Sequence, residues 1–287
     1  MNEMKGNSMA VFNSNDIYPV SADSELPFEQ HRDIFHLTGI DQEETILLLY
    51  PPSKDDKTRE ILFIRKSDNH TKVWEGEKLS KKQANELSGI DNIYFIDDFK
   101  DILSSIATKV DTFYINKNEH YRANSPVETR EDRFISWLLK NYPAHNVAKS
   151  NPILQRQRSI KHPDEIDQIK KACDITRKGF NRVLKFIKPD VWEYEIEAEF
   201  IHEFINSSSK GFAYSPIIAS GNDNNVLHYI KNNKQCKSGE LILMDVGAEY
   251  GNYSSDMTRT IPVSGKFTKR QKEIYNAVLR VKNEATK

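Results

Sequence analysis

The stretch LILMDVGAEYGNYSSDMTRTIPV, at positions 241–263, decides the fold of the second half of the chain. Its first seven residues form an apolar run of strand length that contains Asp245. A turn signal around Gly251 then leads into a second strand-like run that ends at Val263. The pattern predicts a β-hairpin whose first strand is buried.

Two carboxylates in this hairpin indicate a metal site. A two-residue turn at Tyr250 and Gly251 places Asp245 directly opposite Asp256, with Cβ atoms about 4.5–5.5 Å apart. Like charges repel at that distance, and a buried ionised carboxylate needs a partner. Two hard divalent ions about 3.5–4 Å apart fit oxygen ligands placed in this way. The structural alternative is a carboxylate that caps a turn or pairs with Arg259.

The segment before the hairpin supplies two further candidates. An apolar strand that runs into the Ser-Gly-Asn turn at 220–222 can deliver His228 into a cleft. Histidine serves there as a metal ligand, a proton donor or a hydrogen-bond partner of an oxyanion. A lone histidine is more often structural, but its place just before the aspartates favours a functional role. Tyr214 is expected to pack beside the site and not to react itself.

The composition describes an ordinary globular protein. The 287 residues include 42 acidic and 41 basic ones, so no net charge attracts nucleic acid or an acidic membrane surface. No apolar run has the length of a signal peptide or a membrane span. Cys173 and Cys236 are too few for a disulfide framework, which predicts a cytoplasmic protein. Cys236 is expected to be an unreactive thiol in a surface loop.

Hydrophobic patterns predict two domains, at 1–155 and 156–287. Strands are expected at 44–50, 60–64, 93–96 and 112–115 and a helix at 131–141, which together indicate an α/β domain that starts near Phe28. Residues 146–158 lack clear periodicity and are interpreted as the connection. Two helices, one beginning at Pro163 and one running through 193–206, precede the hairpin, and a third is expected at 270–285.

Several segments together resemble a known family. The segments IASG at 218–221, LHY at 227–229, GELILMDVGAEY at 239–250 and DMTRTIPVSGKFT at 256–268 closely resemble Xaa-Pro aminopeptidases (aminopeptidase P). This family belongs to the creatinase, prolidase and methionine aminopeptidase superfamily. The resemblance extends to FEQ at 28–30, LTG at 37–39 and VWEG at 73–76, and so covers most of the chain.

The resemblance implies an α/β (α+β) chain in which a creatinase-like N-terminal domain precedes the first half of a pita-bread catalytic domain. It implies two divalent metal ions, Mn²⁺ above all, with Asp245 and Asp256 as ligands. His228 would contact the substrate and handle protons, and Tyr214 would lie next to the metals. Trp74 matches a tryptophan that reaches a neighbouring subunit's active site in tetrameric members, so a homodimer or homotetramer is expected.

The implied reaction is the hydrolysis of the bond between an N-terminal residue and a following proline, by a hydroxide that bridges the two ions. The partners are therefore peptides with proline second, not nucleic acid or membranes. A prolidase that acts on dipeptides shares the same ligands and stays open, as does a non-catalytic pita-bread module that binds peptides or proteins. Family members supply a histidine and two glutamate ligands from a region that would follow Lys287. We therefore expect an incomplete catalytic domain that is inactive by itself.

Overall fold

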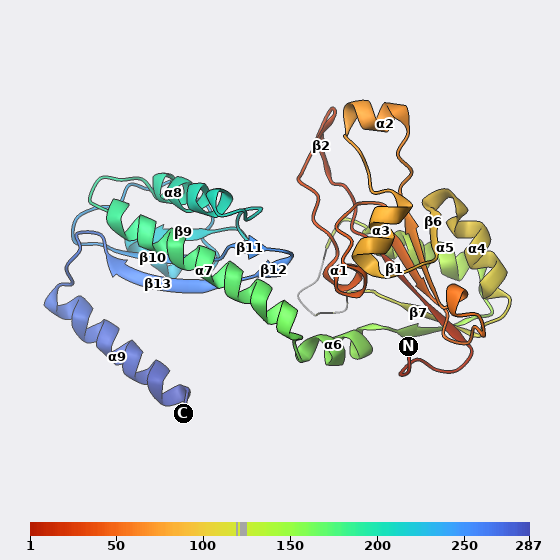
Figure 1. Cartoon of the computed structure of the whole chain (residues 1–287). Helices are drawn as coiled ribbons and strands as arrows, with labels where there is room; N and C mark the ends of the chain where they lie inside the picture. Colours follow the sequence, from red (N-terminus) through yellow and green to blue (C-terminus); the bar gives the residue numbers. More distant parts are fainter. Residues whose placement is uncertain (119, 121–124) are drawn as a thin grey trace. The chain divides into compact units, whose positions relative to one another are not determined.

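The computed structural model describes residues 1–118, 120 and 125–287. The chain divides into two compact units, an N-terminal unit of Met1–Ile160 and a C-terminal unit of Lys161–Lys287, which are described separately (Figure 1). None of the described helices combines the length and the apolarity that a membrane crossing requires.

The N-terminal unit is built on a six-stranded sheet in the order β6-β5-β4-β1-β7-β8. Strand β4 runs antiparallel to its neighbours β1 and β5, and the other neighbouring pairs are parallel. The strands are β1 Ser8–Asn13, β4 Ile46–Leu49, β5 Glu60–Ile64, β6 Ile93–Phe95, β7 Thr112–Ile115 and β8 Asn146–Lys149. Strands β2 Pro19–Ser21 and β3 Ser24–Glu25 form a separate exposed hairpin.

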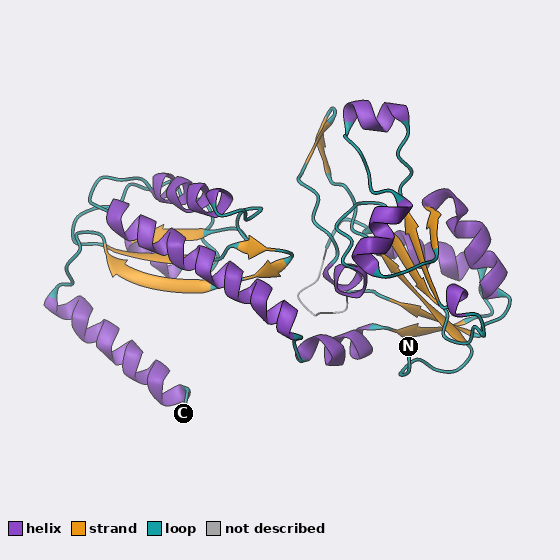
Figure 2. Cartoon of the chain, in the orientation of Figure 1, coloured by secondary structure: helices purple, strands orange, loops and turns teal. Residues whose placement is uncertain are grey.

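Helices cover both faces of this sheet (Figure 2). Side chains of α4 and α5 pack on one face, and those of α1, α3 and α6 pack on the other. Within β1, Met9 and Val11 face the first layer whereas Ala10 and Phe12 face the second. The helices are α1 Arg32–Thr38, α2 Asn69–Trp74, α3 Lys81–Ser88, α4 Phe99–Ala107, α5 Arg130–Asn141 and α6 Asn151–Ser159, with short 3₁₀ turns at Asp56–Thr58 and Ile96–Asp98.

The α/β character predicted for this unit is confirmed, and its predicted strands and helix recur within one or two residues at each end. Two predictions were wrong. The sheet does not start after Phe28, because its central strand β1 lies at Ser8–Asn13. Residues 146–158 are not a bare connection, because they form edge strand β8 and helix α6. Strand β8 is mostly exposed and therefore carries no apolar alternation for a sequence pattern to reveal.

The C-terminal unit packs two helices against a three-stranded antiparallel sheet in the order β13-β10-β9 (Figure 1). Its elements are α7 Pro163–Phe186, α8 Glu193–Asn206, β9 Ile217–Ser220, the 3₁₀ helix η3 Gly221–Asn225, β10 Leu241–Val246, β11 Glu249–Tyr250, β12 Tyr253–Ser254, β13 Met257–Pro262 and α9 Lys269–Ala285. A Cβ on Gly179 of α7 would lie 2.7 Å from the Phe204 ring and 2.9 Å from the Phe200 ring. Glycine at this position therefore allows α7 and α8 to pack closely.

Cys236 lies in the core of this unit and not in a surface loop. Its side chain is fully buried, and its backbone N–H donates to the Val191 carbonyl at 2.8 Å. Burial raises the pKa of the Cys236 thiol to about 11. The predicted inertness of the thiol thus has burial as its physical basis, and the predicted surface position was wrong.

A fully buried carboxylate, Glu193, joins α8 to the segment that carries His228. Its Oε1 accepts hydrogen bonds from the Ser220 backbone N–H at 2.7 Å and the Ser220 hydroxyl at 2.8 Å. Its Oε2 accepts from the Tyr229 hydroxyl at 2.7 Å and the Lys234 backbone N–H at 3.0 Å. Four donors compensate the desolvation of the charge. The carboxylate thereby fixes the end of β9 and both ends of the 229–234 loop.

We predict that Glu193→Gln lowers the free energy of unfolding of the C-terminal unit by about 2–4 kcal/mol. The amide places an N–H group opposite a hydrogen-bond donor and removes the charge that strengthens the other bonds. The measurement is urea unfolding followed by Trp192 fluorescence in a Trp74→Phe, Trp137→Phe background.

The matched control is Glu203→Gln on the same helix, because Glu203 accepts one long hydrogen bond, at 3.4 Å from Ser207. Equal losses in the two variants would contradict the role given to Glu193.

Tyr229 gives a prediction for alkaline pH. Burial and the Glu193 carboxylate raise the pKa of the Tyr229 phenol above its usual range. Above a pH of about 10 the unfolded chain loses this proton whereas the folded chain keeps it, so stability falls as the pH rises. Tyr229→Phe should make this decline of unfolding free energy shallower. At about pH 7 the two pH dependences should coincide, and an identical alkaline slope would contradict the assignment.

Candidate functional site

The hairpin turns one residue later than its sequence suggests. Strand β11 pairs with β12 so that Tyr250 lies opposite Tyr253, which leaves Gly251 and Asn252 as the two turn residues. Their φ angles are 56° and 65°, the left-handed values that a type I′ turn requires at both central positions. The turn predicted at Tyr250 and Gly251 is therefore wrong, because it requires a bulky aromatic residue at positive φ.

This register moves the two aspartates from opposite to diagonal positions. Asp245 lies opposite Thr258, two residues beyond Asp256. Because side chains alternate along a strand, a shift of two residues keeps both carboxylates on the same side of the hairpin. The predicted direct opposition was wrong, but the two side chains still converge.

The point of convergence is the Tyr214 hydroxyl. This hydroxyl donates to Asp245 Oδ1 at 2.6 Å and also lies 3.1 Å from Asp256 Oδ1. The Tyr214 segment is held beside the hairpin because the Ala213 backbone N–H donates to the Gly247 carbonyl at 2.8 Å. Burial, and next the hydrogen bond to Asp245, raise the pKa of the Tyr214 phenol above its usual range. Tyr214 therefore stays protonated and brings the carboxylates together.

Strand β10 is buried on one face only. Ile242, Met244 and Val246 point into the core, whereas Asp245 lies half-buried on the other face and Asp256 is exposed. The predicted burial of this strand therefore holds for one face only. Water reaches the carboxylates, so the cost of burial does not itself demand a metal ion. Their mutual repulsion remains the feature that a cation would relieve.

The donor set fits part of a divalent-cation site. Carboxylate oxygens are the ligands that Mg²⁺, Mn²⁺ and Ca²⁺ prefer, at about six per ion. Across the described part of the chain, no cluster of three or more His, Cys, Asp or Glu side chains could hold a metal. Asp245 and Asp256 can thus contribute to such a site without completing it. The alternative pairing with Arg259 is not formed among the described residues, since its guanidinium donates to the Thr258 carbonyl.

His228 and Trp74 lie on exposed segments. His228 occupies the turn after η3, next to the anchored Tyr229, and no hydrogen bond among the described residues joins it to either aspartate. Trp74 ends α2 with 73% of its surface exposed and its ring 6.1 Å from that of His70. The structure thus brings together Asp245, Asp256 and Tyr214, and the roles predicted for His228 and Trp74 stay predictions.

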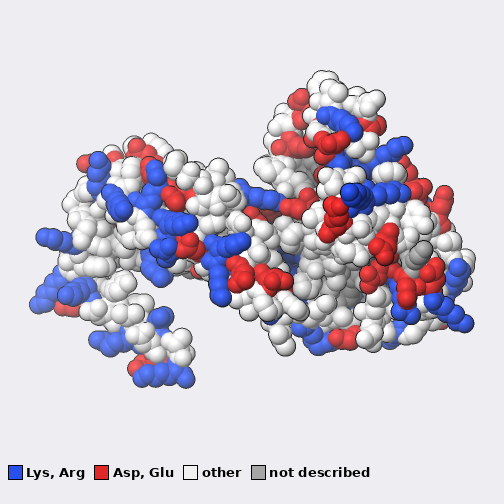
Figure 3. Space-filling view, in the orientation of Figure 1, with Lys and Arg blue, Asp and Glu red and all other residues white. Residues whose placement is uncertain are grey.

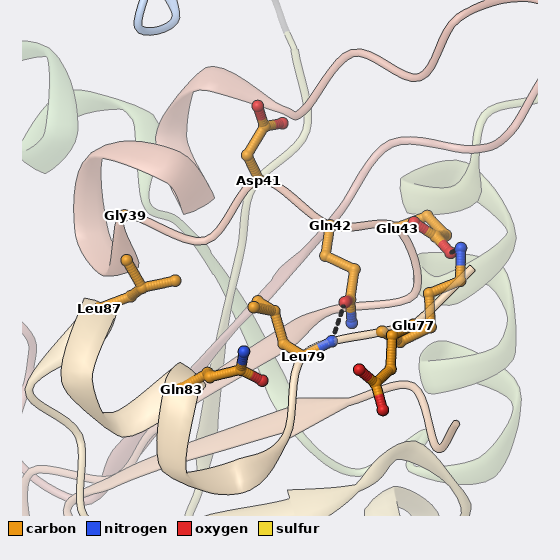
Figure 4. Close-up of a pocket in the computed structure, with 9 residues that line it drawn as sticks. Gly39, Asp41, Gln42, Glu43, Glu77, Leu79, Gln83 and Leu87 are labelled. Carbon is orange, nitrogen blue, oxygen red and sulfur yellow. Dashed lines mark hydrogen bonds and ion pairs between the residues drawn. The ribbon is translucent and has the colours of Figure 1, made fainter. Parts of the chain in front are cut away.

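A cavity of about 520 Å³ in the N-terminal unit is lined by none of these residues. Its lining includes Gln42, Glu43, Glu77 and Lys78 (Figure 4). Two of its carboxylates are already compensated, because Glu43 pairs with Lys78 at 2.6 Å and Glu77 pairs with Lys72 at 2.8 Å. On the face seen in Figure 3 acidic and basic side chains are interspersed, in line with the small net charge.

Sequence reasoning overlooked two buried hydroxyls beside the aspartates, on Thr176 and Ser255. Both contact the backbone N–H of Ala248, two residues after Val246 ends strand β10. The available signal was weak, because a single threonine inside a helix and a serine in a turn are common. Only the packing of α7 against the hairpin brings them together.

Comparison with known proteins assigns both units. The model of metallopeptidase family M24 matches residues 167–287, and that of the aminopeptidase P N-terminal domain matches residues 1–114. The Xaa-Pro aminopeptidase of Escherichia coli (strain K12) is 32% identical over 260 residues, which are 90% of this chain and 59% of that protein.

Solved structures agree with these matches. An aminopeptidase P structure from Bacillus anthracis has a TM-score of 0.89 and 32% identity, and covers 97% of this chain and 66% of that one. Escherichia coli aminopeptidase P in complex with substrate has a TM-score of 0.85 and 30% identity, and the match covers 97% of this chain and 63% of that one. The chain therefore belongs to metallopeptidase family M24 and has the fold of aminopeptidase P, with that enzyme's N-terminal domain preceding part of its catalytic domain.

Proposed function

We propose that the protein is a metal-dependent aminopeptidase that hydrolyses the bond between an N-terminal residue and a following proline. The observation that carries the proposal is the convergence of Asp245 and Asp256 on the Tyr214 hydroxyl, within the segment that the M24 family model matches. The name of the Escherichia coli relative, Xaa-Pro aminopeptidase, supports the substrate class. The chain spans 59% of that relative's length, so activity and substrate are proposals for the protein that contains it.

Each site residue has a defined part in this proposal. Asp245 and Asp256 hold the divalent cations, two ions with Mn²⁺ as the first candidate. Tyr214 keeps the two carboxylates turned toward one point through its hydroxyl. His228, exposed on its turn, donates a hydrogen bond to the oxyanion that develops on the scissile carbonyl. The divalent ions, when bound, polarise that carbonyl and supply an activated water.

The substrate bond explains how proline is recognised. The nitrogen of an Xaa-Pro bond carries no hydrogen, and the pyrrolidine ring fixes its φ angle near −65°. A site shaped for this bond rejects an Xaa-Ala peptide, which is conformationally freer and carries an N–H that would need an acceptor.

Assembly of identical chains belongs to the same proposal. Val73 and Trp74 at the end of α2 are 79% and 73% exposed, and exposed apolar side chains of this kind often mark an interface. In a homo-oligomer Trp74 would contact substrate in a neighbouring subunit.

Free cysteines at Cys173 and Cys236 are compatible with a reducing cytoplasm.

We predict that Asp245→Asn and Asp256→Asn each lower Mn²⁺-dependent hydrolysis of an Xaa-Pro-Xaa tripeptide by more than about 100-fold. This exceeds the 10- to 100-fold typical of groups that only support a ligand. The assay measures release of the first residue by the protein that contains this chain. Asp167→Asn is the control, since Asp167 is an exposed carboxylate on α7 near Lys170. Full activity in either site variant would refute the assignment.

The same assay separates the related functions. Cleavage of Xaa-Pro dipeptides without cleavage of tripeptides would indicate a prolidase. If the protein binds the tripeptide but does not hydrolyse it with any of the divalent ions tested, it would be a non-catalytic binding module.

A further inference from the structure

The place where the hairpin bends, between β10/β13 and β11/β12, is closely packed. We call Gly247, Ala248 and Ser255 the hairpin corner. The Ser255 backbone N–H donates to the Ala248 carbonyl at 3.0 Å. A Cβ built on Gly247 would lie 1.8 Å from the Ser255 carbonyl oxygen, a distance at which the backbone itself must move. Glycine at position 247 therefore lets the two strands cross in contact at this point.

A threonine of helix α7 completes the hydrogen bonds of the corner. Thr176 is fully buried, and its Oγ1 lies 2.6 Å from Ser255 Oγ. The Ala248 backbone N–H is shared between Thr176 Oγ1 at 2.9 Å and Ser255 Oγ at 3.0 Å. The Ser255 hydroxyl donates to the Ala248 carbonyl at 3.0 Å, so the Thr176 hydroxyl is the donor to Ser255. Both hydroxyl protons are thus used inside a buried ring.

The aspartates and the tyrosine of the proposed metal site are all connected to this corner through the backbone. Asp245 precedes Gly247 by two residues, and Asp256 directly follows Ser255. The segment that carries Tyr214 is bound to the same corner through the Gly247 carbonyl. The separation of the two carboxylates therefore depends on how closely Ser255 is held against the β10 end of the hairpin. Thr176 is the α7 side chain whose hydroxyl bonds to both sides of the bend.

We infer that Thr176 is a positioning residue that acts through Ser255: its hydroxyl sets the separation of Asp245 and Asp256 and thereby the affinity for divalent cations. The inference rests on the proposed function, in which this pair holds the ions. Without the hydroxyl, the Ala248 N–H and Ser255 lose their bonds to α7, and the bend is free to open. Hydrogen-bond partners that orient metal ligands typically change metal affinity 10- to 100-fold.

The test compares two substitutions at position 176 in the protein that contains this chain. Thr176→Val keeps the volume and removes the hydroxyl, whereas Thr176→Ser keeps the hydroxyl and removes the methyl group. We expect Thr176→Val to weaken Mn²⁺ binding about 10- to 100-fold and Thr176→Ser to retain it. Free Mn²⁺ measured by electron paramagnetic resonance gives the dissociation constant, and circular dichroism gives the melting temperature.

A matched control separates positioning from stability. Thr38 in the N-terminal unit is also buried, donates to the Ile34 carbonyl at 2.7 Å and accepts from the Ile40 backbone N–H at 3.1 Å. Thr38→Val therefore loses comparable hydrogen bonds, and it should lower the melting temperature without changing Mn²⁺ affinity. Unchanged affinity in folded Thr176→Val protein, or an equal change in Thr38→Val, would overturn the inference.

Mn²⁺ binding by Asp256→Asn distinguishes a failure of the inference from a failure of the proposed function. If wild-type protein does not bind Mn²⁺, or if Asp256→Asn binds it as tightly as wild-type protein does, the aspartate pair does not hold the ion. The proposed function then fails, and the inference fails with it. If Asp256→Asn loses binding and folded Thr176→Val does not, the inference alone fails. Should Thr176→Val not fold, Ser255→Ala removes the other hydroxyl of the ring, and normal Mn²⁺ affinity in that variant would equally refute the inference.

Discussion

The contact between the Ser255 carbonyl and the bare Cα of Gly247 is the constraint on which the candidate site depends. It lets the hairpin bend where β10 ends, and it leaves room for no side chain. Because of that bend, Asp245 and Asp256 share one hydroxyl, that of Tyr214, although their backbone positions are diagonal. In a flat hairpin with the same register, the two residues would be diagonal neighbours whose backbone positions are about 7–8 Å apart. The arrangement of the carboxylates thus depends on how the backbone packs at this point.

The buried Glu193 has a comparable effect at Ser220, the end of β9 that does not pair with Asp245. A carboxylate with four donors is rigid, because any movement leaves a charge without its partners in a medium of low polarity. It therefore holds β9 and the 229–234 loop as a single body. His228 precedes this fixed loop and is itself exposed. The anchored loop therefore keeps the backbone next to His228 in place.

Much of the fold followed from local patterns. Strands β5 and β7 and helices α5, α7 and α8 were predicted because their apolar residues recur at strand or helix spacing between clear stop signals. Central strand β1 was overlooked because SMAVFN is short and packs against two layers, so it shows no alternation. Edge strand β8 was overlooked for the opposite reason, since an exposed NVAK buries little. Both strands are specified by their neighbours in the sheet.

The sequence by itself determined the family to which these segments belong and the candidate residues of the site: two aspartates around one hairpin, and a tyrosine and a histidine before it. Those features are local, or are carried by residue identity alone. Only the tertiary structure decided the register of the hairpin, the one-sided exposure of Asp245, the shared hydroxyl of Tyr214 and the hydrogen bonds of Thr176. Each of these features depends on how closely backbone segments that are distant in the sequence approach one another. Helix α7 and the 212–214 segment set that approach, because both pack against the hairpin corner.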